Sequence, residues 1–153
     1  MQYKKIIFVS EENTYTSPVA EAIMKDKLKR EGLSGVEVES CGRVVLFCEP
    51  ANPKAIAIAK ARGVEMEQHR AVSIEGSAFG SDVLILVMTE KIKLSLYETY
   101  TQAMNVYTIK EFVGETGDID TPYGKGMKEY GEVFNQLDEL TDKVIKKLFI
   151  NNI

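Results

Sequence analysis

The sequence predicts an α/β fold: a three-layer sandwich in which a four-stranded parallel sheet is flanked by helices. Strand-like runs alternate with helix-like segments along the chain, and this alternation is typical of a parallel sheet covered on both sides. The first run is apolar throughout, as expected for a strand buried on both faces. The 153 residues, 44% of them hydrophobic, suit one domain over residues 1–153 with a single core.

The first strand, loop and helix form one unit. Residues 4–9 are a short β-branched and aromatic run, and the polar loop EENTYTS follows at residues 11–17. We expect Ser17 to cap the next helix and Pro18 to take its first position. In open parallel sheets, ligands bind where the first strand passes through its loop to a helix N-terminus. Residues 10–17 are therefore the candidate site.

The rest of the chain supplies three more strands and three more helices. The strands are predicted at residues 36–40, 82–88 and 105–109. Asn52, with the proline after it, opens the second helix, and Thr89 caps the third. A long loop with four glycines precedes the last helix. That helix has the clearest period in the chain, with these apolar residues on one face: Tyr130, Val133, Phe134, Leu137, Leu140, Val144 and Leu148.

Charge and composition argue against several classes of partner. The 23 acidic and 19 basic side chains give a net charge of -4, and phosphate backbones attract basic surfaces, so we expect no nucleic acid partner. The apolar run before Ser10 is too short for a signal peptide, and no run elsewhere could span a bilayer. We expect a cytoplasmic protein with no membrane partner. Cys41 and Cys48 are too close for a disulfide framework, and no cluster has zinc spacing, so we expect reduced thiols and no metal or other cofactor.

The segment IIFVSEENTYTSPVAEAIM resembles the phosphate loop (P-loop) of the low molecular weight protein tyrosine phosphatases. In that family a strand ends in Cys, five residues, Arg, Ser and Pro, and an alanine-rich helix follows. Later segments resemble the family in the same order, at residues 40–42, 49–53, 69–71, 81–89 and 109–124. The last one is closest to the bacterial branch that includes arginine phosphatases. The resemblance covers nearly the whole chain and implies the fold of that family.

The three catalytic side chains that the resemblance implies are replaced. Ser10 stands where the family has its nucleophilic cysteine, Thr16 where it has the phosphate-binding arginine, and Thr121 where it has the aspartic acid that protonates the leaving group. A serine hydroxyl is a far weaker acid than a loop cysteine and needs a neighbouring base. A threonine cannot replace the charged bidentate contacts of arginine, and losing one positioned donor costs about 10²–10³ in rate. We therefore interpret these positions as vestigial.

Glu11 and Glu12 place two carboxylates in a loop that the family uses to bind a dianion. At about 4 Å and an effective dielectric of about 20, each like-charge pair opposes binding by about 4 kcal/mol. We therefore expect phosphate binding to be disfavoured, and an unknown protein or a basic ligand to bind instead. A solvated acidic loop tip is the alternative. The residues expected to form the binding site are Glu11, Glu12, Asn13, Thr14, Tyr15, Ser17, Phe47 and Tyr123.

These observations favour a catalytically inactive pseudophosphatase that acts by binding or regulation. The alternative is a weak or altered phosphatase, a phosphotyrosine or phosphoarginine hydrolase with a non-standard nucleophile such as Ser10 or Cys48. Asp118 or Asp120 would then have to replace the lost general acid through a shift of register. Whether the chain is an enzyme stays open.

A receiver domain is a third class to consider. The acidic pair after the first strand is in keeping with it, because receivers gather carboxylates there. Such a domain also needs a phosphoacceptor aspartate at the end of the third strand, where this chain has Met88 and Thr89. The sequence therefore argues against a receiver domain.

Overall fold

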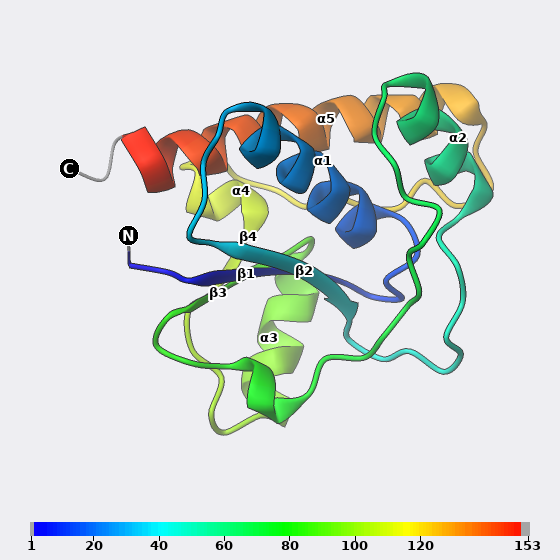
Figure 1. Ribbon diagram of the computed structural model, residues 1–153. Helices are drawn as coiled ribbons and strands as arrows, with labels where there is room; N and C mark the ends of the chain where they lie inside the picture. The colour runs from blue at the N-terminus through cyan, green and yellow to red at the C-terminus, as the bar shows by residue number, and fades with distance from the viewer. Residues whose placement is uncertain (1, 151–153) are drawn as a thin grey trace.

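The computed structural model describes residues 2–150, and within them it contains one parallel sheet (Figure 1). Its strands are β1 (Lys5–Ser10), β2 (Glu37–Gly42), β3 (Val83–Val87) and β4 (Val106–Thr108). They lie in the order β2-β1-β3-β4, and each neighbouring pair is parallel. The predicted four-stranded parallel sheet is confirmed.

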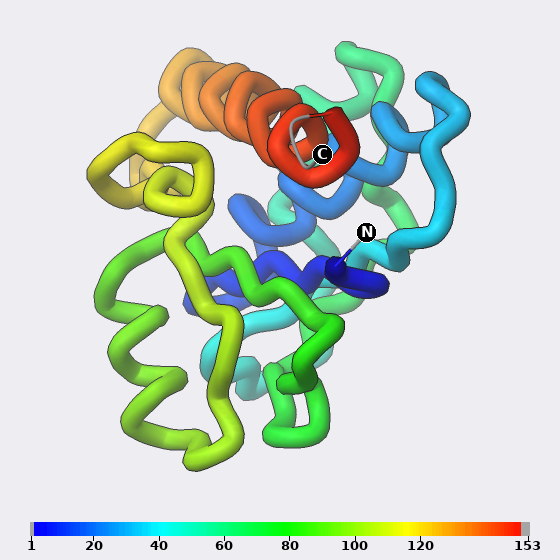
Figure 2. Tube along the Cα trace, turned by 90° about the vertical axis from the view of Figure 1, so that its left-hand side faces the viewer, coloured from blue at the N-terminus to red at the C-terminus, as the bar shows by residue number. Residues whose placement is uncertain are grey.

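Helices cover both faces of this sheet. They are α1 (Thr16–Arg30), α2 (Pro53–Ala61), α3 (Glu90–Thr99), α4 (Ile109–Phe112) and α5 (Met127–Ile145), with a 3₁₀ turn at Gly76–Ala78 and a π-helical turn at Lys146–Ile150. Figures 1 and 2 show α1, α4 and α5 on one side of the sheet and α3 on the other. None of the described helices is long and apolar enough to cross a membrane.

The core has two parts, one on each face of the sheet. Ile6 and Phe8 of β1 belong to the larger cluster, which includes residues of α1 and α5, whereas Ile7 and Val9 belong to the smaller cluster with α3. Successive side chains of a strand point to opposite faces. The continuous apolar run of β1 is therefore buried on both sides, as its sequence predicts.

Two features of the helices differ from the prediction. The helix α1 begins at Thr16, and its N-cap residue, Tyr15, makes no side-chain cap. Ser17 is therefore not a cap but a buried residue of the first turn. The long glycine-containing loop also holds the short helix α4, which was not predicted from the sequence. This helix begins with a capping box in which Thr108 and Glu111 bond to each other's main-chain amides.

The two cysteines are free, as predicted. Cys41 is buried in β2 and Cys48 is exposed. Burial raises the pKa of the Cys41 thiol to about 12, so this thiol stays protonated at neutral pH.

Candidate functional site

Asn13 holds the loop between β1 and α1 in shape. Its φ of 59° lies in the left-handed region, which asparagine tolerates better than most residues. The side chain is fully buried: Oδ1 accepts a hydrogen bond from the Val72 amide at 3.0 Å, and Nδ2 donates to Ser17 Oγ at 2.9 Å and to Ser40 Oγ at 3.0 Å. These three hydrogen bonds fix the shape of the loop.

Ser10 ends β1 with its hydroxyl inside this network. The residue is 5% exposed. Its Oγ accepts a hydrogen bond from the Asn13 amide at 3.0 Å and shares a second one with Ser17 Oγ at 2.6 Å. An amide and a hydroxyl are not bases at neutral pH. The partners that the structure gives Ser10 therefore cannot remove its proton.

His69 reaches the same loop from far along the chain. Its Nε2 lies 2.7 Å from the carbonyl oxygen of Asn13. The resemblance includes residues 69–71, but it did not predict this contact, because the side chain meets a main-chain oxygen. The histidine thus supports the loop backbone, and its hydrogen bond goes to that backbone instead of to the Ser10 hydroxyl.

The side chains at the other two replaced positions, Thr16 and Thr121, are uncharged. Thr16 is buried in the first turn of α1, and Thr121 is half-buried, with its carbonyl oxygen accepting a hydrogen bond from the Tyr123 amide at 2.8 Å. Asp118 accepts a hydrogen bond from the Glu90 amide at 2.9 Å, at the start of α3. This carboxylate therefore already has a main-chain partner. Asp120 is exposed.

Glu11 forms an ion pair that the sequence did not reveal. Arg43 Nε lies 3.0 Å from each carboxylate oxygen, and Arg43 Nη2 lies 2.5 Å from one of them. These hydrogen bonds lower the pKa of Glu11. The signal that would find the pair is strand register, since Ser10 of β1 pairs with Gly42 of β2, which places the next residues of both strands side by side.

Glu12 has a neutral partner instead. The Tyr123 hydroxyl donates a hydrogen bond to Glu12 Oε2 at 3.1 Å. Burial and the nearby carboxylate raise the pKa of Tyr123 to about 12. The phenol therefore stays protonated at neutral pH and does not cancel the charge of Glu12.

A cavity of about 300 Å³ opens beside these two glutamates. We call it the acidic groove, and its lining residues are Glu11, Glu12, Arg43, Val44, Val45, Leu46, Phe47 and Glu49. Its wall is tied to the loop by main-chain hydrogen bonds, from the Arg43 amide to the Ser10 oxygen at 2.9 Å and from the Val44 amide to the Glu11 oxygen at 3.3 Å. Cys48 is not among the lining residues, so the structure does not favour it as a displaced nucleophile.

Several residues expected to bind a ligand prove to be structural. Tyr15 is 1% exposed, its ring packs on that of Tyr130 with centroids 4.6 Å apart, and its hydroxyl donates to the Tyr130 carbonyl oxygen. The binding role predicted for Tyr15 is therefore wrong, because its side chain lies in the core. Asn13 and Ser17 are also buried and hold the loop. Thr14 is half-buried, and its carbonyl oxygen accepts a hydrogen bond from the Asn52 amide at 2.8 Å.

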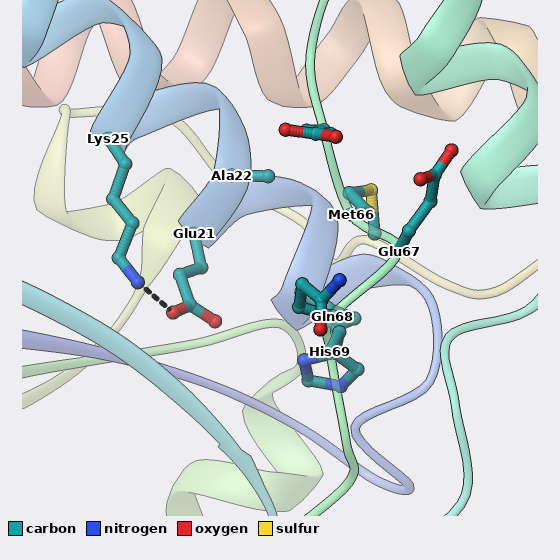
Figure 3. A pocket seen from close by; sticks show the side chains of 9 residues that line it. Glu21, Ala22, Lys25, Met66, Glu67, Gln68 and His69 are labelled. Carbon is teal, nitrogen blue, oxygen red and sulfur yellow. Dashed lines mark hydrogen bonds and ion pairs between the residues drawn. The ribbon is translucent and has the colours of Figure 1, made fainter.

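A second cavity of about 280 Å³ lies between α1 and the segment that carries His69 (Figure 3). On the helix side, Lys25 Nζ lies 2.6 Å from Glu21 Oε2. The other oxygen of Glu21 accepts a hydrogen bond from Ser40 Oγ at 2.6 Å. Because Ser40 also receives a bond from Asn13, side-chain bonds connect this cavity to the loop.

Known proteins resemble the chain over nearly its whole length. The family model described as low molecular weight phosphotyrosine protein phosphatase matches residues 5–151. A protein-arginine-phosphatase of Geobacillus stearothermophilus is 32% identical over 146 residues, which cover 94% of this chain and 95% of that protein. The low molecular weight protein-tyrosine-phosphatase PtpB of Staphylococcus epidermidis is 29% identical over 140 residues, which cover 92% of this chain and 96% of PtpB.

Solved structures agree with these matches. A low molecular weight protein tyrosine phosphatase from T. tengcongensis superimposes with a TM-score of 0.88 at 36% identity, covering 94% of this chain and 98% of that one. An arginine phosphatase in which the active-site cysteine is mutated to serine, and that serine is phosphorylated, gives a TM-score of 0.89 at 31% identity, with 97% of each chain covered.

Proposed function

Because the chain belongs to the low molecular weight phosphotyrosine protein phosphatase family, we propose that it is a catalytically inactive member, a pseudophosphatase that acts by binding or regulation. The observation that carries this proposal is the environment of Ser10. Its hydroxyl bonds to the Asn13 amide and to Ser17 Oγ, and neither group can act as a base. A serine nucleophile needs a base to take its proton.

Two further losses support an inactive site. At neutral pH the buried side chain of Thr16 brings no positive charge to the phosphoryl oxygens, and Thr121 cannot protonate a leaving group. The carboxylate nearest in sequence to Thr121 is Asp120, which is exposed, while Asp118 bonds to the start of α3. A hydrolytic mechanism would therefore lack a nucleophile, a cation and an acid at the same time.

The charge of the loop supports a ligand other than phosphate. Arg43 neutralises the charge of Glu11, so the repulsion of phosphate that the sequence predicts comes mainly from Glu12. Glu12 is exposed, so its repulsion of a nearby anion falls to about 1 kcal/mol per unit charge in water. The N-terminus of α1 attracts an anion by about 0.3–1 kcal/mol. Because the helix end is thus offset by Glu12 and no side-chain cation replaces the arginine of the family at Thr16, a cationic or neutral partner suits the loop better.

This proposal involves no metal or other cofactor, and a cytoplasmic location stays a prediction. The binding partner is a protein or a basic ligand, not a nucleic acid or a membrane, in keeping with the net charge of -4. The side chains available to it are those of the acidic groove, together with Tyr123.

The test compares the natural chain with a triple variant, Ser10→Cys, Thr16→Arg and Thr121→Asp. We expect no turnover of p-nitrophenyl phosphate or phosphoarginine by the natural chain. The triple variant should gain activity at least about a hundredfold above the natural chain, because each restored group contributes about 10²–10⁴ in rate. The single variant Ser10→Cys is the matched control and should gain far less. Hydrolysis by the natural chain that disappears in Ser10→Ala would refute the proposal.

One comparison favours a second candidate function. In the arginine phosphatase whose active-site cysteine is mutated to serine, that serine carries a phosphoryl group. In this second candidate, Ser10 accepts a phosphoryl group: the P–N bond of phosphoarginine breaks, a P–Oγ bond forms, and the hydroxyl proton passes to the departing guanidine. Intact-mass measurement after incubation with phosphoarginine distinguishes the two candidates. A gain of one phosphoryl group that is absent in Ser10→Ala favours the acceptor, and an unchanged mass favours the pseudophosphatase.

A further inference from the structure

The acidic groove combines unpaired carboxylates with an exposed apolar wall. We propose that it binds a segment of a partner protein in which a cationic side chain stands next to an apolar one. This inference rests on the proposed function, because it names the chemical class of ligand for the same loop. Charge, exposed apolar surface and rigidity each support it.

The groove carries more negative charge than its single cation can balance. Glu11, Glu12 and Glu49 line it together with Arg43. The guanidinium of Arg43 donates its hydrogen bonds to the Glu11 carboxylate. Within residues 2–150, the ion pairs include neither Glu12 nor Glu49. Two carboxylates are thus available to a cation from outside, and an anion is repelled.

The groove also has an apolar, exposed part in its lining. Leu46 is 82% exposed and Phe47 72%, and Val44 in the same segment is half-exposed. Single exposed apolar residues are ordinary on protein surfaces, whereas a contiguous group of them beside a cavity is typical of a protein interaction site. The apolar side chain of the partner segment covers this wall and removes it from water.

The aromatic side chains favour a cation beside the apolar contact. Cations are attracted to the faces of aromatic rings, and a guanidinium stacks on them while it bonds to carboxylates. Phe47 lines the groove, and Tyr123 bonds to Glu12 at its edge. The Arg43 contact with Glu11 already shows that a carboxylate of this loop accepts a guanidinium through both oxygens.

The groove is held in place before any ligand arrives. Main-chain bonds join Arg43 to Ser10 and Val44 to Glu11, and the Val45 amide donates to Ser73 Oγ at 2.8 Å. The loop on the other side is fixed by buried Asn13. A preformed site loses less conformational entropy when it binds. The partner segment can therefore be short.

The experiment uses a peptide array in which arginine or lysine stands next to each apolar residue type, with copies in which glutamate replaces the cation. We expect the full-length chain to bind the cationic peptides more strongly than their glutamate copies.

Fluorescence anisotropy with the peptide that binds best then gives dissociation constants. Glu12→Gln and Glu49→Gln should each weaken binding about tenfold, as expected for the loss of one charge-assisted contact. Phe47→Ser should weaken it as well, and added salt should weaken it further.

The matched control is Glu67→Gln, which removes an exposed carboxylate that lines the second cavity (Figure 3). Binding should be unchanged in this variant. The inference is overturned if the array shows no preference for cationic peptides, or if Glu67→Gln weakens binding as much as Glu12→Gln does. Turnover of p-nitrophenyl phosphate, measured on the same protein, separates the two failures. Turnover contradicts the proposed inactivity, whereas an inactive protein without peptide preference contradicts only the ligand class.

Discussion

Glu11 and Glu12 are neighbours in the chain, yet the structure gives their charges different partners. Glu11 meets the guanidinium of Arg43, while Glu12 accepts a hydrogen bond from the neutral hydroxyl of Tyr123. A charged partner cancels most of the field that a distant ligand feels, and a neutral one does not. The two carboxylates that look equivalent in sequence therefore contribute unequally to what the loop can bind.

At the residue scale, Arg43→Gln should raise the pKa of Glu11 towards that of an ordinary glutamate, because Arg43 supplies the hydrogen bonds that lower it. The pKa of Glu11 is lower in the folded state than in the unfolded state. The ion pair therefore stabilises the fold fully at pH values above the unfolded-state pKa. This contribution is lost as the pH falls through the folded-state pKa. For a half-exposed pair the effect is under about 1 kcal/mol. NMR titration of the carboxylate measures the pKa.

The control for this variant is Lys91→Gln, which removes the weakest of the influences on the pKa of Glu11. It should shift that pKa far less than Arg43→Gln. An equal shift in both variants, or none in Arg43→Gln, would show that the ion pair does not persist in solution.

Residue identity alone predicted part of this site. Glu11, Glu12 and Phe47 were among the residues expected to form the binding site, and all three line the acidic groove. Arg43 and His69 were missed, because their contacts with the loop depend on how distant segments pack. Tyr15 was predicted to bind a ligand for a related reason. Its position in a polar loop does not indicate that its ring packs on Tyr130.

At the scale of elements, local signals placed most helix and strand boundaries within one or two residues. Asn52 and Thr89 cap α2 and α3 with their side chains, as predicted. Ser17 failed as a cap because its hydroxyl bonds to Ser10 and Asn13 across the loop. Local sequence preference predicted that the Ser17 hydroxyl would cap the helix, whereas in the folded chain it bonds to Ser10 and Asn13 instead.

Thr89→Ala should therefore lower the free energy of unfolding by about 1 kcal/mol, the usual value of such a cap. The Thr89 hydroxyl oxygen accepts a hydrogen bond from the Ile92 amide at 3.2 Å, and alanine leaves that amide without an acceptor. Urea denaturation measures the change. Thr101→Ala, at an exposed position just beyond α3, is the matched control and should change stability by less than about 0.5 kcal/mol. Equal effects in both variants would argue against the cap.

At the scale of the whole molecule, strand and helix alternation was enough to predict the sheet and its flanking layers. Parallel register then brings the ends of β1 and β2 together, which creates the acidic groove from residues more than thirty positions apart. The composition of that groove could not be predicted, since it depends on the path of the chain after β2. Its shape follows from main-chain bonds that no sequence pattern marks.

The central claim is that the chain keeps the loop of a phosphatase while its charge repels the phosphate such a loop would hold. Titration with inorganic phosphate, followed through the amide NMR signals of residues 11–17, tests this claim most directly. We expect no saturable change in the natural chain at millimolar phosphate, and saturable binding once Thr16→Arg and Glu12→Ser are introduced together. Saturable shifts of these amides in the natural chain would contradict the claim.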